Sequence, residues 1–198
     1  SPRDDQKPVL DYKEGSMAIS AVPGAGKTTI LLALIIKLLQ AKEESENIFV
    51  LTYMESAARN FKERIKKVCP SLEKLPNIST IHGLALRILK ENSNFVKAGL
   101  DENFEVCDDN QRQKIIREIM YKLQIDAENF DKYEKAVSAL KLSGAEKISY
   151  TTDSELKRFL KFYYTYNLYL KDRNIIDYDD MLVLSVKILQ ENHDIAPV

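Results

Sequence analysis

The chain has 198 residues, two cysteines and nearly balanced charge, with 29 Lys and Arg residues against 30 Asp and Glu residues. This length is sufficient for one ordinary domain or two small ones with a hydrophobic core. The distant Cys69 and Cys107 argue against a disulfide framework or a zinc site, and the balanced charge argues against a global basic surface for nucleic acid.

The first part of the chain alternates strand-like and helix-like segments. Strands are expected over residues 17–20, 47–53 and 77–82, and each precedes an expected helix, over 27–39, 55–69 and 83–92. This alternation predicts an α/β fold, a parallel sheet with helices on both faces. The apolar run of the first helix is interrupted by Lys37 and is too short for a membrane span, so we expect a soluble, cytoplasmic protein.

From about Asn92 onward the strand signals stop and helical segments take over. Helices are expected over residues 110–124, 128–142 and 154–173, with turn-like segments over 143–153 and 172–180. Asp109 or Asn110 is expected to cap the first of these helices, and Asp153 or Ser154 the third. The sequence thus predicts an α/β domain over 1–91 and an all-α subdomain over 92–198.

A stripe of large side chains repeats at helical spacing in the third of these helices. It could be a surface that stacks nucleic-acid bases, because lysines and an arginine alternate with it. A core face is the favoured interpretation, since its members fall mainly on one side of the helix. They are Leu156, Phe159, Leu160, Tyr163, Tyr166, Asn167 and Leu170.

A glycine-rich segment, AVPGAGKTT over residues 21–29, lies between the first expected strand and its helix. It resembles the phosphate-binding pattern G-x-x-x-x-G-K-[ST], in which backbone amides and a helix N-terminus surround phosphate oxygens. Gly24 and Gly26 let the backbone approach the ligand, Lys27 contacts the β- and γ-phosphates, and the Thr28 hydroxyl ligates Mg²⁺. The predicted ligands are therefore ATP and Mg²⁺, held by residues that include Ala25 and Thr29.

Taken with VLTYMESAARNFKERI, ISTIHGLALRIL and IIDYDDML, this segment makes the chain resemble the amino-terminal part of the UvrD/Rep-like superfamily 1 DNA helicases. The resemblance implies a first RecA-like domain with an α-helical insertion. It implies that Ala21 takes the first position of the phosphate loop, and that Gln6 reads the adenine ring, for which an amide that donates and accepts is suited.

The resemblance also implies a path for single-stranded DNA, or for DNA with a single-stranded tail. Tyr53 is expected to stack on a base, and Thr80 and His82 to hydrogen-bond phosphate or sugar. Glu55 departs from the family pattern, because it places a negative charge where a phosphate backbone would pass. Asp177, Asp179 and Asp180 are interpreted as capping and docking residues and not as a metal site.

Hydrolysis of ATP by this class also requires an acidic residue after an apolar strand, and no such Asp-Glu pair follows the glycine loop. We therefore expect the front part of a motor, monomeric and inactive alone, whose C-terminal motor domain lies elsewhere in a longer protein. Two alternatives stay open. One is a P-loop kinase with the helical region as a lid, which requires arginines that converge on phosphate, and the other is a non-enzymatic ATP-binding docking module.

Overall fold

A computed structural model describes residues 4, 7–20, 22, 24–41, 44–143 and 152–191 of the chain. The chain divides into two compact units, Ser1–Ile81 and His82–Val198. The predicted domain boundary, between residues 91 and 92, lies one helix further along. Among the described residues, no helix combines the length and apolar character needed to cross a lipid bilayer.

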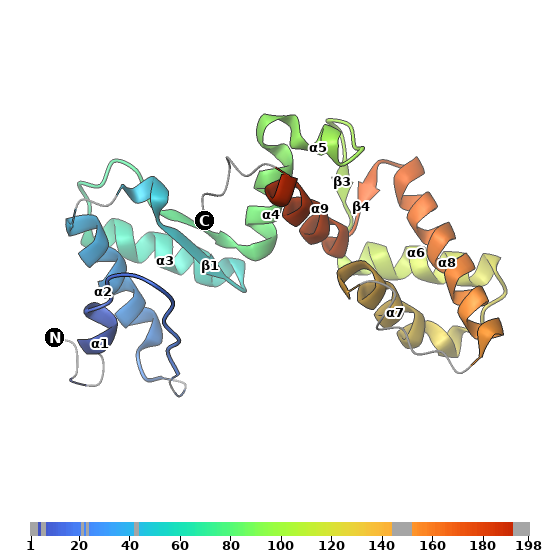
Figure 1. Cartoon of the computed structure of the whole chain (residues 1–198), viewed down its shortest axis with the longest axis horizontal. Coiled ribbons are helices and arrows are strands. Elements are labelled where there is room, and N and C mark those ends of the chain that lie inside the picture. The colour runs from blue at the N-terminus through green and yellow to red at the C-terminus, as the bar shows by residue number, and fades with distance from the viewer. Residues whose placement is uncertain are drawn as a thin grey trace. The chain divides into compact units, whose positions relative to one another are not determined.

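The first unit is a small parallel sheet with helices packed on it (Figure 1). Its elements are α1 (Lys7–Leu10), α2 (Lys27–Gln40), the 3-10 turn η2 (Ser45–Asn47), β1 (Phe49–Thr52), α3 (Glu55–Val68) and β2 (Asn77–Thr80). Strands β1 and β2 pair in parallel with Val50 opposite Ile78. The prediction of a parallel sheet is thus confirmed for these two strands.

The core of this unit lies on one face of the sheet. Ile78 is buried against Leu32 and Ile35 of α2 and against Phe61 and Ile65 of α3. On β1 the alternate side chains Phe49 and Leu51 are 55% and 46% exposed. Within the described part of the unit, helices therefore cover one face of the sheet, whereas the sequence predicted helices on both faces.

The predicted strand over residues 17–20 is wrong in this structure. These four residues have no regular secondary structure, and Met17 and Ile19 are 45% and 39% exposed instead of buried. An apolar segment forms a strand only where a neighbouring strand satisfies its backbone, and the described sheet consists of β1 and β2 alone.

The second unit contains mainly helices. Its elements are α4 (Ile81–Lys90), which starts at the unit boundary, the 3-10 turn η3 (Glu91–Ser93), α5 (Asn94–Lys97), β3 (Glu105–Val106), α6 (Asp109–Lys122), the 3-10 turn η4 (Ala127–Asn129), α7 (Phe130–Ser143), α8 (Asp153–Asp172), β4 (Ile175–Ile176) and α9 (Tyr178–Glu191). The structure differs from the sequence-based prediction in two places. Strands β3 and β4 pair in parallel, although no strand was expected after Asn92, and α9 begins inside the expected turn over 172–180.

Two hydrophobic cores fill this unit. One joins α6, α7 and α8 around side chains such as Ile116, Val137 and Phe159, and the other joins α4 and α9 around Leu89 and Met181. Figure 1 displays α6, α7 and α8 beside one another, with β3 and β4 connecting them to α4, α5 and α9.

The predicted core face of α8 is confirmed for most of its length. At one position, a residue outside the predicted stripe takes the place of a predicted one. Phe159, Tyr166 and Leu170 are buried, whereas Leu160 is exposed and Phe162 takes its place in the core. The reason is the helical period of 3.6 residues, which carries Leu160 past the edge of the buried face.

The helix caps lie one residue earlier than predicted. Asp108, in an extended backbone conformation, accepts a hydrogen bond from the Gln111 amide at 2.8 Å, and the Gln111 side chain accepts one from the Asp108 amide at 3.0 Å. Thr152 caps α8 by accepting a hydrogen bond from the Glu155 amide at 3.2 Å. Asp109 and Asp153 are the first helical residues instead of the caps.

Candidate functional site

The glycine loop ends where α2 begins. Gly24 and Gly26 have φ angles of 80° and 84°, in the left-handed region that glycine adopts without strain, and Gly26 forms the N-cap of α2. No side chain caps this helix end. The first-turn residues Lys27, Thr28 and Thr29 therefore stand at a helix N-terminus whose amides suit an anion.

The Lys27 side chain lies beside the loop from which it comes. Its ammonium group is exposed and donates a hydrogen bond to the Val22 carbonyl at 3.1 Å. Ala25 belongs to the same turn, because its amide donates to Val22 at 3.2 Å. The cation thus stays close to the loop backbone, where the sequence predicted its contact with phosphate. Gln6 and Ala21 lie outside the described residues.

A hollow of about 370 Å³ lies next to the start of α2. Thr28 lines it from α2, and Ser56, Ala57, Asn60 and Phe61 line it from α3. On the α3 side, Ser56, Ala57 and Asn60 are small or polar and leave room for a polar ligand next to the Phe61 ring. Thr28 is the residue that the sequence predicted as a magnesium ligand, and its hydroxyl fits an ion that takes most of its oxygens from phosphates and water.

Three residues of this region were missed by sequence reasoning. Ser56 and Asn60 line the hollow, and the next residue in the same row of α3, Arg64, donates to the Thr29 hydroxyl at 3.3 Å. Their spacing of four residues puts all three on one side of the helix. Sequence reasoning could have identified them from that spacing. It aligns three polar side chains along α3, next to the buried side chains of Ala58, Phe61 and Ile65.

Tyr53 follows β1 in the loop before α3 and is 91% exposed. Met54 caps α3 in an extended conformation, and the Thr52 hydroxyl donates to the Met54 carbonyl at 3.1 Å. The ring of Tyr53 is therefore presented to solvent at the carboxyl end of a parallel strand, an edge where ligands commonly bind.

Thr80 has a different environment from the one expected. It is 6% exposed, and its hydroxyl donates to the Glu55 carboxylate at 2.9 Å. Glu55 therefore has a structural partner, which the sequence did not indicate. A contact between the Thr80 hydroxyl and a phosphate has to compete with this bond.

His82 lies in the first turn of α4 and is half-buried. Its ring meets the Tyr178 ring edge-on, with 5.1 Å between the centroids and 61° between the planes. Tyr178 is the first residue of α9. The histidine of one motif thus packs against the aromatic residue of the DYDD segment, although the two are far apart in the sequence.

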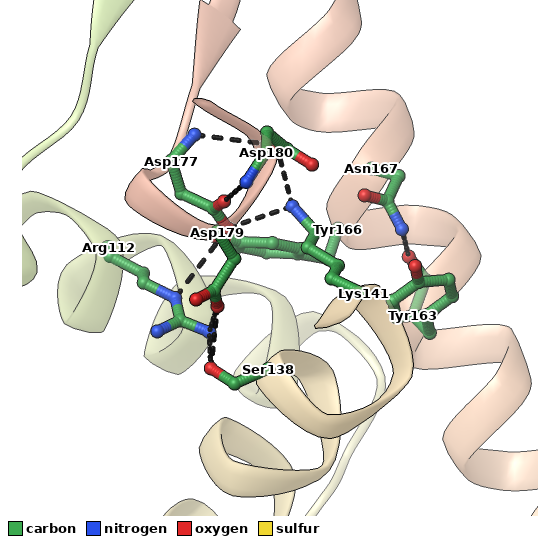
Figure 2. A network of polar contacts seen from close by, with 9 residues as sticks. All are labelled: Arg112, Ser138, Lys141, Tyr163, Tyr166, Asn167, Asp177, Asp179 and Asp180. Atoms are coloured by element: carbon green, nitrogen blue, oxygen red, sulfur yellow. Dashed lines mark hydrogen bonds and ion pairs between the residues drawn. The ribbon is translucent and has the colours of Figure 1, made fainter. Parts of the chain in front are cut away.

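The three aspartates of that segment form a buried polar cluster with side chains of α6, α7 and α8 (Figure 2). Lys141 is 2.8 Å from Asp177 and 2.6 Å from Asp180, and the Asp180 amide donates to Asp177 at 2.8 Å. Further polar contacts add Arg112 to Asp179 at 3.1 Å, Ser138 to Asp179 at 2.6 Å and Tyr166 to Asp177 at 2.8 Å.

The cluster supports the interpretation of capping and docking. Asp177 caps α9, and Lys141 and Arg112 join α9 to α7 and α6. The segment therefore holds helices together, in line with the capping and docking role that the family resemblance implied.

Burial and charge shift the acid–base equilibria of this cluster. Burial alone would raise the pKa of Asp177, but the Lys141 ammonium charge and its hydrogen bond hold that pKa below its ordinary value. Burial and the charge of Asp177 raise the pKa of Asp180. Burial, with a contribution from Asp177, also raises the pKa of the Cys107 thiol to about 11. The cluster thus favours one firmly ionised carboxylate beside Lys141.

The chain is similar in sequence to known proteins over most of its length. The family described as UvrD/REP helicase N-terminal domain matches residues 3–197. The chain is 27% identical to the ATP-dependent DNA helicase PcrA of Staphylococcus aureus (strain Mu50) and 29% identical to the ATP-dependent DNA helicase Rep of Buchnera aphidicola subsp. Baizongia pistaciae, in each case over 192 residues and 94% of the chain. It covers 26% of the first relative and 28% of the second, so it spans little more than a quarter of their length.

Proposed function

Because the chain belongs to the UvrD/REP helicase N-terminal domain family, we propose that it forms the nucleotide-binding front part of an ATP-dependent DNA helicase. One observation carries the proposal. The glycine loop places Lys27 and Thr28 at the N-terminus of α2, beside a hollow that α3 lines with two polar side chains, Ser56 and Asn60, and two apolar ones. A helix N-terminus with a lysine and a hydroxyl is suited to a triphosphate with Mg²⁺.

In this proposal each residue of the loop has one task. Gly24 and Gly26 keep the backbone amides open toward phosphate, and the Lys27 ammonium group leaves the Val22 carbonyl to contact phosphate oxygens. Arg64 holds the Thr29 side chain next to the helix start. Thr28 would ligate Mg²⁺, which when bound neutralises charge on the phosphates.

Single-stranded DNA is the second ligand that we propose. Stacking of a base on the exposed Tyr53 ring contributes about 1–3 kcal/mol in comparable sites. His82 offers an imidazole for a phosphate or sugar, in an orientation supported by Tyr178. Thr80 is a weaker candidate, since its hydroxyl already donates to Glu55.

Turnover is not proposed for this chain alone. The sequence after the loop contains no apolar strand followed by Asp-Glu, and hydrolysis in this class needs such an acid to position Mg²⁺ and water. We expect nucleotide binding without steady-state hydrolysis, and hydrolysis and unwinding as properties of a longer protein.

The kinase alternative finds no support in the helical unit. It required arginines that converge on phosphate, and the four arginines of α6 to α9 have separate partners. These are Asp177 and Asp179 for Arg112, the Phe130 ring for Arg117, the Gln124 carbonyl for Arg158 and the Tyr169 ring for Arg173.

The decisive experiment compares Lys27→Ala with Lys13→Ala, an exposed lysine that precedes the loop. Fluorescent ATP is titrated with Mg²⁺ into each variant, and Lys27→Ala is expected to bind roughly tenfold or more weakly, since it loses a charge-assisted contact. Lys13→Ala is expected to bind as the parent does. Equal binding by all three proteins would refute the proposed nucleotide site.

DNA binding is tested separately by anisotropy of a labelled oligothymidine. The affinity is expected to fall steeply with salt, because phosphate contacts release counterions. Tyr53→Ala is expected to weaken binding, and Tyr121→Ala, which removes a ring of similar exposure from α6, serves as its control.

A further inference from the structure

Helix α8 carries a second apolar row, on the side opposite its buried face. Leu160, Tyr164 and Leu168 are 44%, 69% and 42% exposed. Their spacing of four residues aligns them along the helix surface. The buried residues Phe159, Phe162, Tyr166 and Leu170 already supply the core contacts of this helix, so the exposed row has no role in the core.

The exposed row is surrounded by positive charge. Lys157, Lys161 and Lys171 are exposed on the same side of α8, and within the described part of the chain none of them pairs with a carboxylate. The helix contains no acidic residue between Glu155 and Asp172. A solvated helix face usually mixes both signs of charge, whereas this one has aspartates only at its two ends, Asp153 and Asp172, and no carboxylate along the apolar row between them.

We propose that this face, defined by Leu160, Tyr164, Leu168 and the three lysines, is a docking site for an acidic amphipathic helix of another protein. Apolar side chains at a spacing of four residues match the anchors of a helix that lies along another helix. Lysines beside the row favour glutamate and aspartate on the rim of the partner, which sets its orientation and speeds its association.

The same observations disfavour two other occupants. A nucleic acid would use Tyr164 and the lysines, but its phosphates and sugars leave the aliphatic Leu160 and Leu168 without a partner. A second copy of the chain would bring this face against itself around a twofold axis, so that lysines would meet lysines and repel one another.

The test uses the 198-residue chain and a fluorescein-labelled synthetic helical peptide with leucines on one face and glutamates beside them. The peptide is expected to bind, and the same peptide with lysine in place of glutamate is not. Simultaneous replacement of Leu160, Tyr164 and Leu168 by alanine is expected to weaken binding about tenfold or more, as loss of central anchors does. Replacement of the three lysines by glutamine is expected to slow association and to reduce its dependence on salt.

Matched controls separate docking from folding. Val96→Ala and Val186→Ala remove exposed apolar side chains from α5 and α9 and are expected to leave peptide affinity unchanged. Circular dichroism of all variants is expected to match the parent, because the replaced residues are exposed. The proposal is overturned if the acidic peptide does not bind at about 1 mM, if the lysine peptide binds equally well, or if oligothymidine instead protects α8 from hydrogen exchange.

Discussion

Lys27 and Lys141 occupy opposite environments in the two units. Lys27 is exposed at the start of α2, where its ammonium group contacts a backbone carbonyl of its own loop. Lys141 is 3% exposed and lies between the carboxylates of Asp177 and Asp180. A charge that must receive an anionic ligand remains accessible, whereas a charge that orients helices is surrounded by its counter-ions. Accessibility and not residue type therefore separates Lys27, a candidate binding residue, from Lys141, a structural one.

The two units also differ in the number of their cores and in how polar side chains are used. The first unit has one small core on one face of its sheet, and its candidate ligand-binding residues Lys27 and Thr28 lie in the first turn of α2, with Tyr53 in a loop. The helical unit has two cores and a polar cluster that joins α6, α7, α8 and α9. We therefore expect substitutions in the first unit to change ligand binding and substitutions in the cluster to change stability.

The largest effect is expected for Lys141→Met. It removes the cation that lies 2.8 Å from the buried Asp177 carboxylate and leaves Arg112, at 3.7 Å, as the remaining one. Breaking a buried ion pair in this way typically costs up to about 3–5 kcal/mol of the free energy of unfolding. Urea denaturation measures the loss. Lys122→Met, which breaks an exposed pair with Glu118 at 2.6 Å, is the control and should hardly change stability. A Lys141→Met protein as stable as the parent would contradict the structural role of the cluster.

The next largest effect is a difference in alkylation rate between the two cysteines. Cys107 is buried in the helical unit with a pKa of about 11, and Cys69 in the first unit is partly exposed. A thiol raised from its ordinary value of 9.0 to about 11 has a roughly hundredfold smaller thiolate fraction at pH 8. Mass spectrometry after iodoacetamide treatment should find Cys69 alkylated first, and the Cys107 rate should rise with pH up to about 11. Equal rates would show that Cys107 is accessible and unshifted.

A smaller effect is expected for glycine substitutions. Gly24 and Gly99 have φ angles of 80° and 76°, and a Cβ at either position meets no atom within 4 Å. Gly24→Ala and Gly99→Ala should therefore each cost about 1–2 kcal/mol through backbone strain alone. Only Gly24→Ala should also weaken nucleotide binding, which calorimetry with ATP and Mg²⁺ can measure. A loss of nucleotide affinity in Gly99→Ala would mean that strain and not position is responsible.

The smallest effect is expected for Glu55→Gln. The amide oxygen can still accept the hydrogen bond from Thr80, while the negative charge next to the proposed DNA path disappears. Affinity for oligothymidine should rise about two- to threefold, the size expected for one exposed charge. Glu63→Gln, further along α3, is the control. A decrease for Glu55→Gln would indicate that this carboxylate has a positive role in binding.

The sequence predicted most helices and two of the strands, since their patterns are long or strongly periodic. It predicted the start of α2 from Gly26 and Lys27, and the family resemblance that it indicated is confirmed by the match over residues 3–197. It was wrong over 17–20, because an apolar segment alone does not provide the neighbouring strand that its backbone requires. It missed β3 and β4, which are too short for any period to be recognised.

The candidate site could be predicted only in part. The glycine loop carries its own chemistry in consecutive residues, so Lys27 and Thr28 could be named from the sequence. Ser56, Asn60 and Arg64 could not, because their approach to α2 depends on how two helices pack on one sheet. The bond from Thr80 to Glu55 likewise joins side chains that meet only when β2 lies beside the start of α3.

What the sequence determined by itself is local: the glycine loop, the helical periods and the motifs that assign the family. The tertiary structure decided which side chains are exposed and which are buried. It exposes Lys27 and the apolar row that contains Leu160, and it buries Lys141 and the apolar row that contains Phe159. The physical reason is that backbone conformation depends on neighbouring residues, whereas burial and ion pairing depend on residues brought together from distant parts of the chain.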